Sequence, residues 1–553
     1  MLLQFVRRTS QQQWPIQDRR SGLPSSTVSW AFFFMSHVLE AYGFAENDST
    51  SVIYSRKIAG KSADWTAGAM LFETRSLPIN KAELCPFASS DSKAEGLQYM
   101  LIVDAGSSGS RLRMYQRSSS SPLSEISPSS ADAPLFEVKP GLSSYADTPS
   151  QAGPSLAGPI EAAKTYIPKD AQASALLFVK ATAGMRLLVK AKAKAVFDAV
   201  RAYLGSGGTS NSTFKFVSAE TISGEEEGVF GYLSVNYLLG KLASNSTTVG
   251  ALDLGGASTQ VTFKPIQDIR DNEFDFYVEE ARQTVYTKSY IRYGQDQALL
   301  RSFESLVMKF PGASTIDHPC FNLGFNQTET VLGSMKTFVG TSNATECSAL
   351  AKNLLHIDYE CLMPACAIAG EHMTEVTGSF QAFNSFFYTA NGLGLVGWSA
   401  SAALSRKQIY DAATTICAKN ITAAVADSGQ AVGFAKLYCF MGFFMSHVLE
   451  AYGFAENDST SVIYSRKIAG KSADWTAGAA LFESQSLPLV FTKNLCSAST
   501  TSTTSSSGTA TSTTSSSGTS ASTTSPMSVS MAWRANMRAM YTTILVVLGM
   551  QQA

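Results

Sequence analysis

The sequence predicts an α/β protein in which short buried strands alternate with glycine-rich loops and helices. Residues 99–115 and 249–263 each combine an apolar run, a loop of small residues and a second strand-like run. Residues 178–200 change from a strand-like apolar run to a helical pattern. The chain has 553 residues, 45% of them hydrophobic and 16% charged, which allows about three domains of ordinary size.

The first segment begins with an apolar run at residues 99–103, which suits a buried strand. The run ends in the loop of residues 104–111 (DAGSSGSR), and residues 112–115 alternate like a partner strand. Glycine and serine let backbone N–H groups approach a phosphate, and the hydroxyls add donors. Asp104 would repel an anion, so it fits this loop only if it holds a metal ion or metal-bound water.

The second segment repeats this arrangement. Residues 249–252 lead into the loop of residues 253–260 (DLGGASTQ), and residues 261–263 follow as a strand. One Asp-x-Gly turn is weak evidence, because many hairpins contain one. Two such loops with small residues and flanking strands predict two phosphate loops that face each other across a cleft.

Two further segments lie between the loops. Residues 178–188 predict a strand that turns into a helix, which continues through Val196 and Val200 and stops at Gly205. A turn at a helix N-terminus favours anions. In residues 223–228 (SGEEEG), Ser223 and Glu226 have the spacing of a capping box. The sequence leaves open whether the acidic residues 225–227 only complement the helix dipole or take part in chemistry.

Charge and histidine content exclude some classes of function. The formal net charge of −1 gives no support for nucleic-acid binding. No Ser–His–Asp pattern is visible. All five histidines lie outside the segments described above, so we expect structural roles for His37, His318, His356, His372 and His447.

The cysteines and glycosylation sequons indicate an oxidising, secretory context. There are eight cysteines without a CxxC pair, and Asn-x-Ser/Thr occurs seven times. Free buried thiols in a cytosolic enzyme remain the alternative. The first residues do not open like a signal peptide, because the apolar run at residues 30–35 is too short. Spacing allows three short-range pairs without proving them, namely Cys320 with Cys347, Cys361 with Cys366, and Cys417 with Cys439.

A near-perfect repeat affects the N-terminal part of the chain. Residues 33–78 recur at 443–488 with only three differences, and Cys85 or Cys496 follows each copy. Cys85 and Cys496 follow their copies at nearly the same distance, which gives no reason to pair them with each other. Because two copies cannot fill one structural position, we expect residues 1–92 to lie outside the fold. A recent duplication or a misjoined gene model would both produce this pattern.

The C-terminal part differs in composition from the rest. Residues 497–526 are almost wholly Ser, Thr, Gly and Ala, which predicts a flexible, O-glycosylated stalk. The apolar run at residues 540–550 is too short to span a bilayer, which needs about 20 residues. The sequence leaves two alternatives for this tail. It is either a lipid-anchor signal, which would attach the protein to a membrane, or a frayed chain end.

Taken together, these segments resemble the apyrase, or nucleoside triphosphate diphosphohydrolase, family of the actin-like ATPase superfamily. That family has five short motifs in fixed order, and matches lie at residues 104–111, 181–188, 223–236, 252–260 and 473–478. Tyr232 stands where many members have Trp, and Ala477 where many have Leu. These departures concern base preference or local packing rather than the chemistry.

The resemblance implies an α/β fold of two ribonuclease-H-like, actin-like domains with the active-site cleft between them, followed by a disordered Ser/Thr-rich tail. Domain I would comprise residues 93–222 and 466–496 and bind phosphate. Domain II would comprise residues 223–465 and carry the catalytic base and the base-binding site. The leader at 1–92 and the tail at 497–553 would lie outside both domains.

The resemblance also implies roles for individual residues in hydrolysis of the terminal phosphate of nucleoside tri- or diphosphates. Glu227 would activate water, which Ser258 and Gln260 would orient. Asp104, Asp253, Thr182 and Trp475 would surround Ca²⁺ or Mg²⁺, mostly through water. The phosphate would be bound by residues of the two loops, namely Ser107, Ser108, Gly109, Ser110, Arg111, Gly256 and Ala257.

Base recognition is expected from two tyrosines in segments that resemble those sandwiching the base in relatives. Tyr388 and Tyr452 are the candidates, whereas Phe383, Phe386 and Phe387 are expected in the core. Stacking tolerates any base, so broad specificity is expected. An exopolyphosphatase or kinase of the same superfamily is the alternative enzyme, and an inactive surface binding protein is the alternative outside enzymes. The expected location is extracellular or within the secretory pathway.

Overall fold

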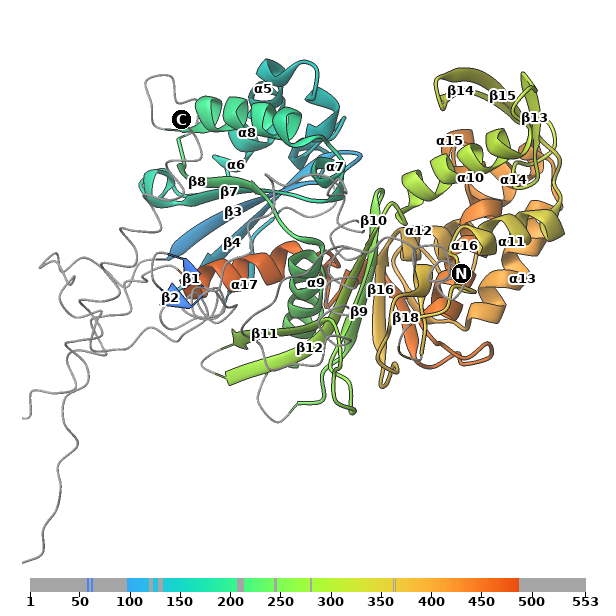
Figure 1. Cartoon of the computed structure of the whole chain (residues 1–553). Coiled ribbons are helices and arrows are strands. Elements are labelled where there is room, and N and C mark those ends of the chain that lie inside the picture. The colour runs from blue at the N-terminus through green and yellow to red at the C-terminus, as the bar shows by residue number, and fades with distance from the viewer. Residues whose placement is uncertain are drawn as a thin grey trace, which may run out of the picture. The chain divides into compact units, whose positions relative to one another are not determined.

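The computed structural model describes most of the chain between residues 97 and 486 (Figure 1). The described residues are 57–58, 61–62, 97–118, 123–127, 133–205, 213–242, 246–278, 281–361, 363 and 365–486. The expectations for the leader at 1–92, apart from four residues, and for the tail at 497–553 therefore lie outside the described residues. Those four residues form β1 (Lys57–Ile58) and β2 (Lys61–Ser62), which pair in the same register as β19 (Lys467–Ile468) and β20 (Lys471–Ser472) in the second copy of the repeat.

The first sheet has the strand order β5-β4-β3-β7-β8, with β6 beside β4. β4 pairs antiparallel with β3, whereas β3, β7 and β8 run parallel to one another. The strands are β3 (Gln98–Ala105), β4 (Ser110–Arg117), β5 (Ser124–Glu125), β6 (Glu137–Val138), β7 (Leu176–Ala181) and β8 (Lys215–Thr221).

The second sheet has the order β11-β12-β10-β9-β16-β18-β17. Its central five strands repeat the first sheet, because β12, β10 and β9 are antiparallel neighbours and β9, β16 and β18 are parallel. The fold-class prediction, an α/β protein with two similar cores, is confirmed. The strands are β9 (Gly250–Leu254), β10 (Ser258–Phe263), β11 (Glu273–Val278), β12 (Ala281–Ile291), β16 (Phe380–Asn384), β17 (Ser401–Ala403) and β18 (Val462–Ser465).

The central strand of the first sheet is buried on both faces. Leu101 and Val103 belong to a core with α8 (Lys190–Leu204), whereas Met100 and Ile102 belong to a second core with α17 (Thr476–Ser486). Such two-sided burial explains why residues 99–103 are apolar without alternation. Three shorter helices also belong to this half, namely α5 (Ala152–Ser155), α6 (Ala157–Ala163) and α7 (Ala183–Arg186).

The helix predicted to begin within residues 178–188 and to stop at Gly205 is instead two helices. α7 ends at Arg186, and α8 begins after Val189, whose φ of −59° and ψ of 141° are not helical. The predicted stop at Gly205 is confirmed, since Gly205 caps α8. The break matters for the site because it leaves Arg186 at the end of a short helix.

Two helices lie between the sheets (Figure 1). α9 (Gly224–Leu238) packs on β9, β10 and β12 and also on α17, which in turn contacts β3 and β4. α9 is apolar on almost every side, as expected for a helix buried all round. The two helices approach closely at Gly478, whose N–H donates to Ser234 Oγ over 2.8 Å.

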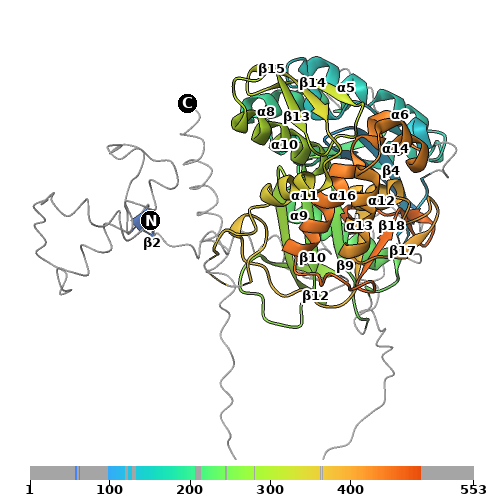
Figure 2. The ribbon, with the colours of Figure 1, turned by 90° about the vertical axis from the view of Figure 1, so that its right-hand side faces the viewer.

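Further helices cover the second sheet, where α11, α13 and α16 pack side by side (Figure 2). Within the described residues, one helical stretch, Val432–Ala451, is long and apolar enough to cross a membrane, but 72% of it is buried inside the protein, as in a core helix. The helices are α10 (Gln295–Lys309), α11 (Ala344–Asn353), α12 (Ser385–Gly392), α13 (Arg406–Cys417), α14 (Ile421–Ser428), α15 (Val432–Ala435) and α16 (Tyr438–Ala451).

A small sheet and several single turns complete the described chain. The sheet has the order β13-β15-β14 and comprises β13 (Thr315–His318), β14 (Asn326–Val331) and β15 (Ser334–Gly340). The 3-10 helices are Ala133–Phe136, Leu142–Tyr145, Pro149–Gln151, Gln172–Ser174 and Ile368–Gly370.

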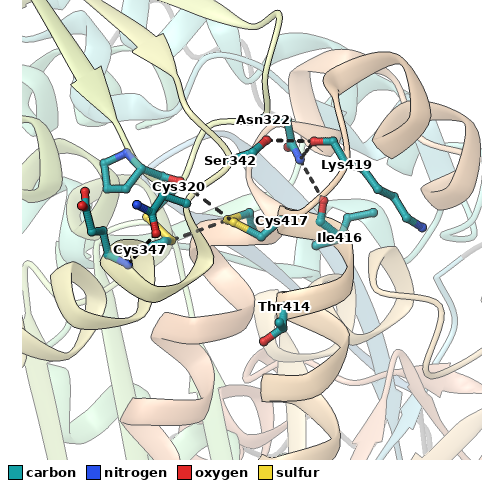
Figure 3. The surroundings of a disulfide bond; sticks show 12 residues. Cys320, Asn322, Ser342, Cys347, Thr414, Ile416, Cys417 and Lys419 are labelled. Atoms are coloured by element: carbon teal, nitrogen blue, oxygen red, sulfur yellow. Dashed lines mark hydrogen bonds between the residues drawn. A yellow bond between two sulfur atoms is a disulfide. The ribbon is translucent and has the colours of Figure 1, made fainter.

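The three cysteine pairs allowed by spacing are confirmed as disulfides, namely Cys320–Cys347, Cys361–Cys366 and Cys417–Cys439. Two of them are neighbours, with 3.6 Å between Cys347 Sγ and Cys439 Sγ. They hold the loop after β13, α11, α13 and α16 together (Figure 3). Asn322 strengthens the same junction, because its Nδ2 donates to the carbonyls of Ile416 and Lys419 at 2.8 and 2.9 Å.

Candidate active site

The structure brings the two predicted phosphate loops together. One loop joins β3 to β4 and the other joins β9 to β10, so each belongs to the equivalent hairpin of its sheet. They touch at Ser107 and Gly256, because a Cβ on Gly256 would overlap Ser107 Oγ. A Cβ at residue 256 would also overlap the Asp296 carboxylate, so glycine allows the close approach of the two loops.

The residues of the first loop differ in their access to a ligand. Ser108 is exposed and Ser107 is half-buried, whereas Gly109 and Ser110 are buried. Arg111 is already engaged by acidic side chains, with Nη2 donating to Glu137 Oε1 at 3.0 Å and Nη1 at 3.9 Å from Asp104 Oδ2. In the second loop, Gly256 is half-buried and Ala257 is buried. Among the predicted phosphate-binding residues, Ser107, Ser108 and Gly256 thus have the best access.

Several buried acids converge beside the loops. Burial raises the pKa of Asp104 to about 7, opposed by Arg111 and reinforced by the charges of Asp474 and Glu227. Burial likewise raises the pKa of Asp253 well above its usual range, and Glu227 adds to this effect. Asp104 Oδ1 is buried and has no hydrogen-bond partner among the described residues. A cation would relieve this surplus of negative charge, so the side chains fit a divalent metal ion.

Glu227 is the residue of the acidic run that faces the site. Glu226 completes the capping box of α9, as its Oε2 accepts from the Ser223 N–H at 2.7 Å and its N–H donates to Ser223 Oγ at 3.0 Å. The side chain of Glu227 is instead buried, which raises its pKa, while the Arg186 guanidinium lowers it. The structure therefore gives the capping position to Glu226 and places the Glu227 side chain beside Arg186.

The three residues expected to handle water form one hydrogen-bond network. Gln260 Nε2 lies 3.2 Å from Glu227 Oε2 and 2.7 Å from Ser258 Oγ. Two residues that the sequence reasoning missed complete the network. Arg186 Nη2 donates to Glu227 Oε2 at 2.8 Å and to Ser258 Oγ at 3.1 Å, and Ser289 Oγ accepts from Gln260 Nε2 at 2.9 Å.

Thr182 and Trp475 differ in their positions. Thr182 follows β7, and its N–H donates to Ala105 O at 3.3 Å, so it adjoins the first loop. The Trp475 ring is buried and stacks on Phe230 at 6.2 Å, which is a packing position between α9 and α17. In the same motif, Asp474 is the residue whose charge acts on Asp104 and Asp253. The sequence reasoning missed Asp474, although an acid next to the expected tryptophan was a visible signal.

The two tyrosines expected to bind the base are placed differently. Tyr388 is 45% exposed on α12, with its ring 5.9 Å from the exposed Trp398 ring. α12 starts next to Asn384, whose Nδ2 donates to Asp253 Oδ1 at 2.6 Å. Tyr452 is only 2% exposed and packs on Tyr290 at 5.9 Å. The expectation for Tyr452 therefore needs correction, because a ring enclosed in the core offers no free face to a base.

The aromatic residues expected in the core are found there. Phe383, Phe386 and Phe387 are all buried. Tyr232, the departure in the third motif, is buried on α9 and meets Phe276 edge-on at 6.4 Å. This departure therefore concerns packing between α9 and β11.

Known proteins resemble the chain over most of its length. Ectonucleoside triphosphate diphosphohydrolase 8 of Bos taurus is 34% identical, with 69% of this chain and 81% of that protein covered. Ectonucleoside triphosphate diphosphohydrolase 2 of Mus musculus is 32% identical, with coverage of 71% and 84%.

Solved structures also resemble this one. A nucleoside triphosphate hydrolase from Neospora caninum is 15% identical, covers 78% of this chain and 100% of its own, and gives a TM-score of 0.49. A Ppx/GppA protein of Aquifex aeolicus is 13% identical, covers 70% and 98%, and gives a TM-score of 0.40.

The family profile agrees with the five motifs. Residues 90–499 match the GDA1/CD39 (nucleoside phosphatase) family, a range that contains both sheets and every residue of the candidate site. The family predicted from the motifs is confirmed. The chain belongs to the GDA1/CD39 (nucleoside phosphatase) family.

Proposed function

We propose that the protein hydrolyses the terminal phosphate of nucleoside tri- and diphosphates with Ca²⁺ or Mg²⁺ as cofactor. The contact between the two loops beside Asp104, Asp253 and Glu227 carries this proposal. Small loop residues provide donors for phosphate, and the acids provide a place for the cation that accompanies a nucleotide. The names and activities of the relatives support the same substrate class.

The loops bind the phosphate chain. Backbone N–H groups and hydroxyls of Ser107 and Ser108 act from the first loop, and Gly256 and Ala257 act from the second. Gly109, Ser110 and Arg111 complete the first loop behind them. Because the loops come from different sheets, a phosphate held by both is fixed from two sides, which positions it for attack.

Asp104 and Asp253 would hold the metal ion, mostly through water, with Thr182 beside them. The unpaired Oδ1 of Asp104 supports this assignment. Trp475 acts through packing in this arrangement, next to Asp474. A bound divalent cation supplies neutralisation of the phosphate charge that builds up during transfer.

Glu227 is the general base. It takes a proton from water while the water oxygen forms a bond to the terminal phosphorus and the bridging P–O bond breaks. Ser258 and Gln260 orient that water, which the hydrogen bond from Gln260 to Ser258 and the contact of Gln260 with Glu227 support. No covalent intermediate is needed, so positioning and charge stabilisation account for the chemistry.

The nucleotide base stacks on Tyr388, the exposed ring nearest to the Asn384–Asp253 contact along α12. We place the protein in the secretory pathway or at the cell surface, which the three disulfides support. Attachment to a membrane through the C-terminal tail is part of this proposal and is tested by phase partitioning of the full chain.

The first prediction concerns Glu227. Glu227→Gln keeps the size and most hydrogen bonds of the side chain but removes the base, so kcat should fall by about 10²- to 10⁴-fold while nucleotide affinity changes little. Release of phosphate from ATP and ADP gives kcat, and equilibrium titration gives the affinity.

Glu226→Gln is the matched control, because glutamine also completes a capping box and the neighbouring position does not face the site. Its turnover should stay near that of the unmodified protein. Near-normal turnover of Glu227→Gln would remove Glu227 from the mechanism.

A further inference from the structure

We propose that Arg186 is a positioning residue for the hydrolysis, because its guanidinium fixes Glu227 and Ser258 in one arrangement around the attacking water. This inference rests on the function proposed above. The sequence motifs gave Arg186 no role, and the contacts of its side chain assign one.

The guanidinium of Arg186 is held at three points. Nη1 donates to the carbonyl of Ile222 at 3.0 Å, and Nη2 donates to Glu227 Oε2 at 2.8 Å and Ser258 Oγ at 3.1 Å. Arg186 ends α7, which follows a strand of the first sheet, whereas Glu227 lies on α9 and Ser258 on β10 of the second. A planar guanidinium with fixed donors suits such a bridge better than a flexible ammonium group.

These contacts also decide which carboxylate oxygen of Glu227 is available. Arg186 Nη2 donates to Oε2, and Gln260 Nε2 approaches the same oxygen to 3.2 Å. Among the residues that the structure describes, none donates to Oε1. Arg186 thereby reserves Oε1 for the proton that leaves the water.

The hydroxyl of Ser258 is oriented by the same donors. Its Oγ accepts from Arg186 Nη2 and from Gln260 Nε2, which uses both lone pairs. Its own proton is then free to donate to a water oxygen. A water between the two groups would donate to Glu227 Oε1 and accept from Ser258, and one lone pair would remain for attack on phosphorus.

Arg186 is also the cation that pairs with Glu227 in a strongly acidic site. Four charged groups interact electrostatically with Glu227. They are Arg186 from α7, Glu225 from its own helix, Asp104 from β3 and Asp253 from β9. Burial raises the pKa of Glu227, and Arg186 opposes this by charge and hydrogen bonding. Loss of the cation should therefore raise this pKa further, so the base would be ionised only at higher pH.

The test compares Arg186→Gln and Arg186→Lys with the unmodified protein and measures kcat and KM for ATP across pH with saturating metal. For Arg186→Gln we expect kcat to fall at least about tenfold, KM to change by less than about threefold, and the acid limb of kcat to move to higher pH. Arg186→Lys keeps a positive charge but cannot donate to Glu227, Ser258 and Ile222 together as the guanidinium does. Its kcat should therefore stay low, while the acid limb of its kcat should move less than in Arg186→Gln.

Arg282→Gln is the control, because Arg282 also pairs with a carboxylate, that of Asp275, but at an exposed position on β12. Its kinetics and pH profile should not change. If Arg186→Gln fails to fold, the acid limb of kcat is compared between Arg186→Lys and the unmodified protein instead.

A double variant separates failure of this inference from failure of the proposed function. If Arg186 acts through Glu227, adding Arg186→Gln to Glu227→Gln should cost little beyond the single change. Near-normal turnover of Glu227→Gln alone would refute the proposed function. If Glu227→Gln has a low turnover, the proposed function stands. The role of Arg186 would then be overturned if Arg186→Gln showed an unmoved acid limb, or if it raised KM without lowering kcat.

Discussion

At the residue scale, most acids of the site have at least one polar partner at hydrogen-bond distance. Arg186 donates to Glu227 at 2.8 Å, Asn384 to Asp253 at 2.6 Å and Arg113 to Asp474 at 3.2 Å. Among the described residues, the Asp104 carboxylate has only the Arg111 guanidinium as an ion-pair partner, 3.9 Å away. Because buried polar groups are normally satisfied, Asp104 is the acid with the most to gain from a cation.

The sequence could identify the acids but not their partners. Asp104, Glu227 and Asp253 stand in short motifs whose chemistry is local, so their place in the site was predictable. Arg113 and Asp474 are 361 residues apart, and Asn384 lies 131 residues from Asp253, so only the fold brings them together. The prediction for Tyr452 was wrong for a related reason. A sequence does not reveal whether an aromatic ring is buried.

The second prediction tests whether the nucleotide base stacks on Tyr388 rather than on Tyr452. Tyr388→Ala should raise KM for ATP by about 5- to 150-fold, since one base stack is worth ~1–3 kcal/mol, and should leave hydrolysis of inorganic triphosphate unchanged. Tyr452→Phe, in the core, should leave KM for ATP unchanged. Steady-state kinetics with both substrates decide the matter, and an unaltered KM in Tyr388→Ala would rule out stacking on this ring.

At the scale of elements, the contact of α9 with α17 aligns two motifs that are far apart in the sequence. α9 carries Glu227, and α17 follows directly after Asp474 and Trp475. The start of α9 was predictable, because the capping box depends on residues three apart. The division between α7 and α8 was not, because Leu187 and Leu188 continue a helical pattern that only the extended Val189 interrupts.

The third prediction concerns this helix contact. A Cβ on Gly478 would overlap the carbonyl oxygen of Phe230, so Gly478→Ala should destabilise the protein by about 1–3 kcal/mol through overpacking. Urea unfolding gives the free energy. Gly433→Ala on α15 is the control, because nothing lies within 4 Å of its added Cβ apart from its chain neighbours, and its stability should stay equal or rise by up to ~1 kcal/mol. Equal stability of the two variants would contradict the close approach.

At the scale of the whole molecule, the two sheets share the order and direction of their five central strands. The hairpins that hold the loops were predictable from apolar runs and small residues. The parallel strands β16 and β18 were not, because about a hundred residues of inserted structure separate β10 from β16, and such long-range pairing leaves no local pattern. The domain boundaries drawn from the sequence stay a prediction.

The last prediction concerns residues 1–92. Both sheets and all residues of the proposed site lie within residues 97–486, and the family match begins at residue 90. A chain that begins at residue 93 should therefore fold and hydrolyse ATP at a rate close to that of the full chain. Specific activity and melting temperature of the two forms provide the measurement. Loss of folding in the shorter form would mean that the leader contributes to the core.

The neighbouring disulfides have a practical consequence for mutagenesis. If Cys320 alone is replaced by serine, the freed Cys347 sulfur lies 3.6 Å from Cys439 Sγ, within reach of the Cys417–Cys439 bond. Attack by the Cys347 thiolate would form a Cys347–Cys439 bond and release Cys417 as a thiolate. A single replacement can thus exchange one cross-link for another, whereas removing both partners of a bond leaves the second cross-link unchanged.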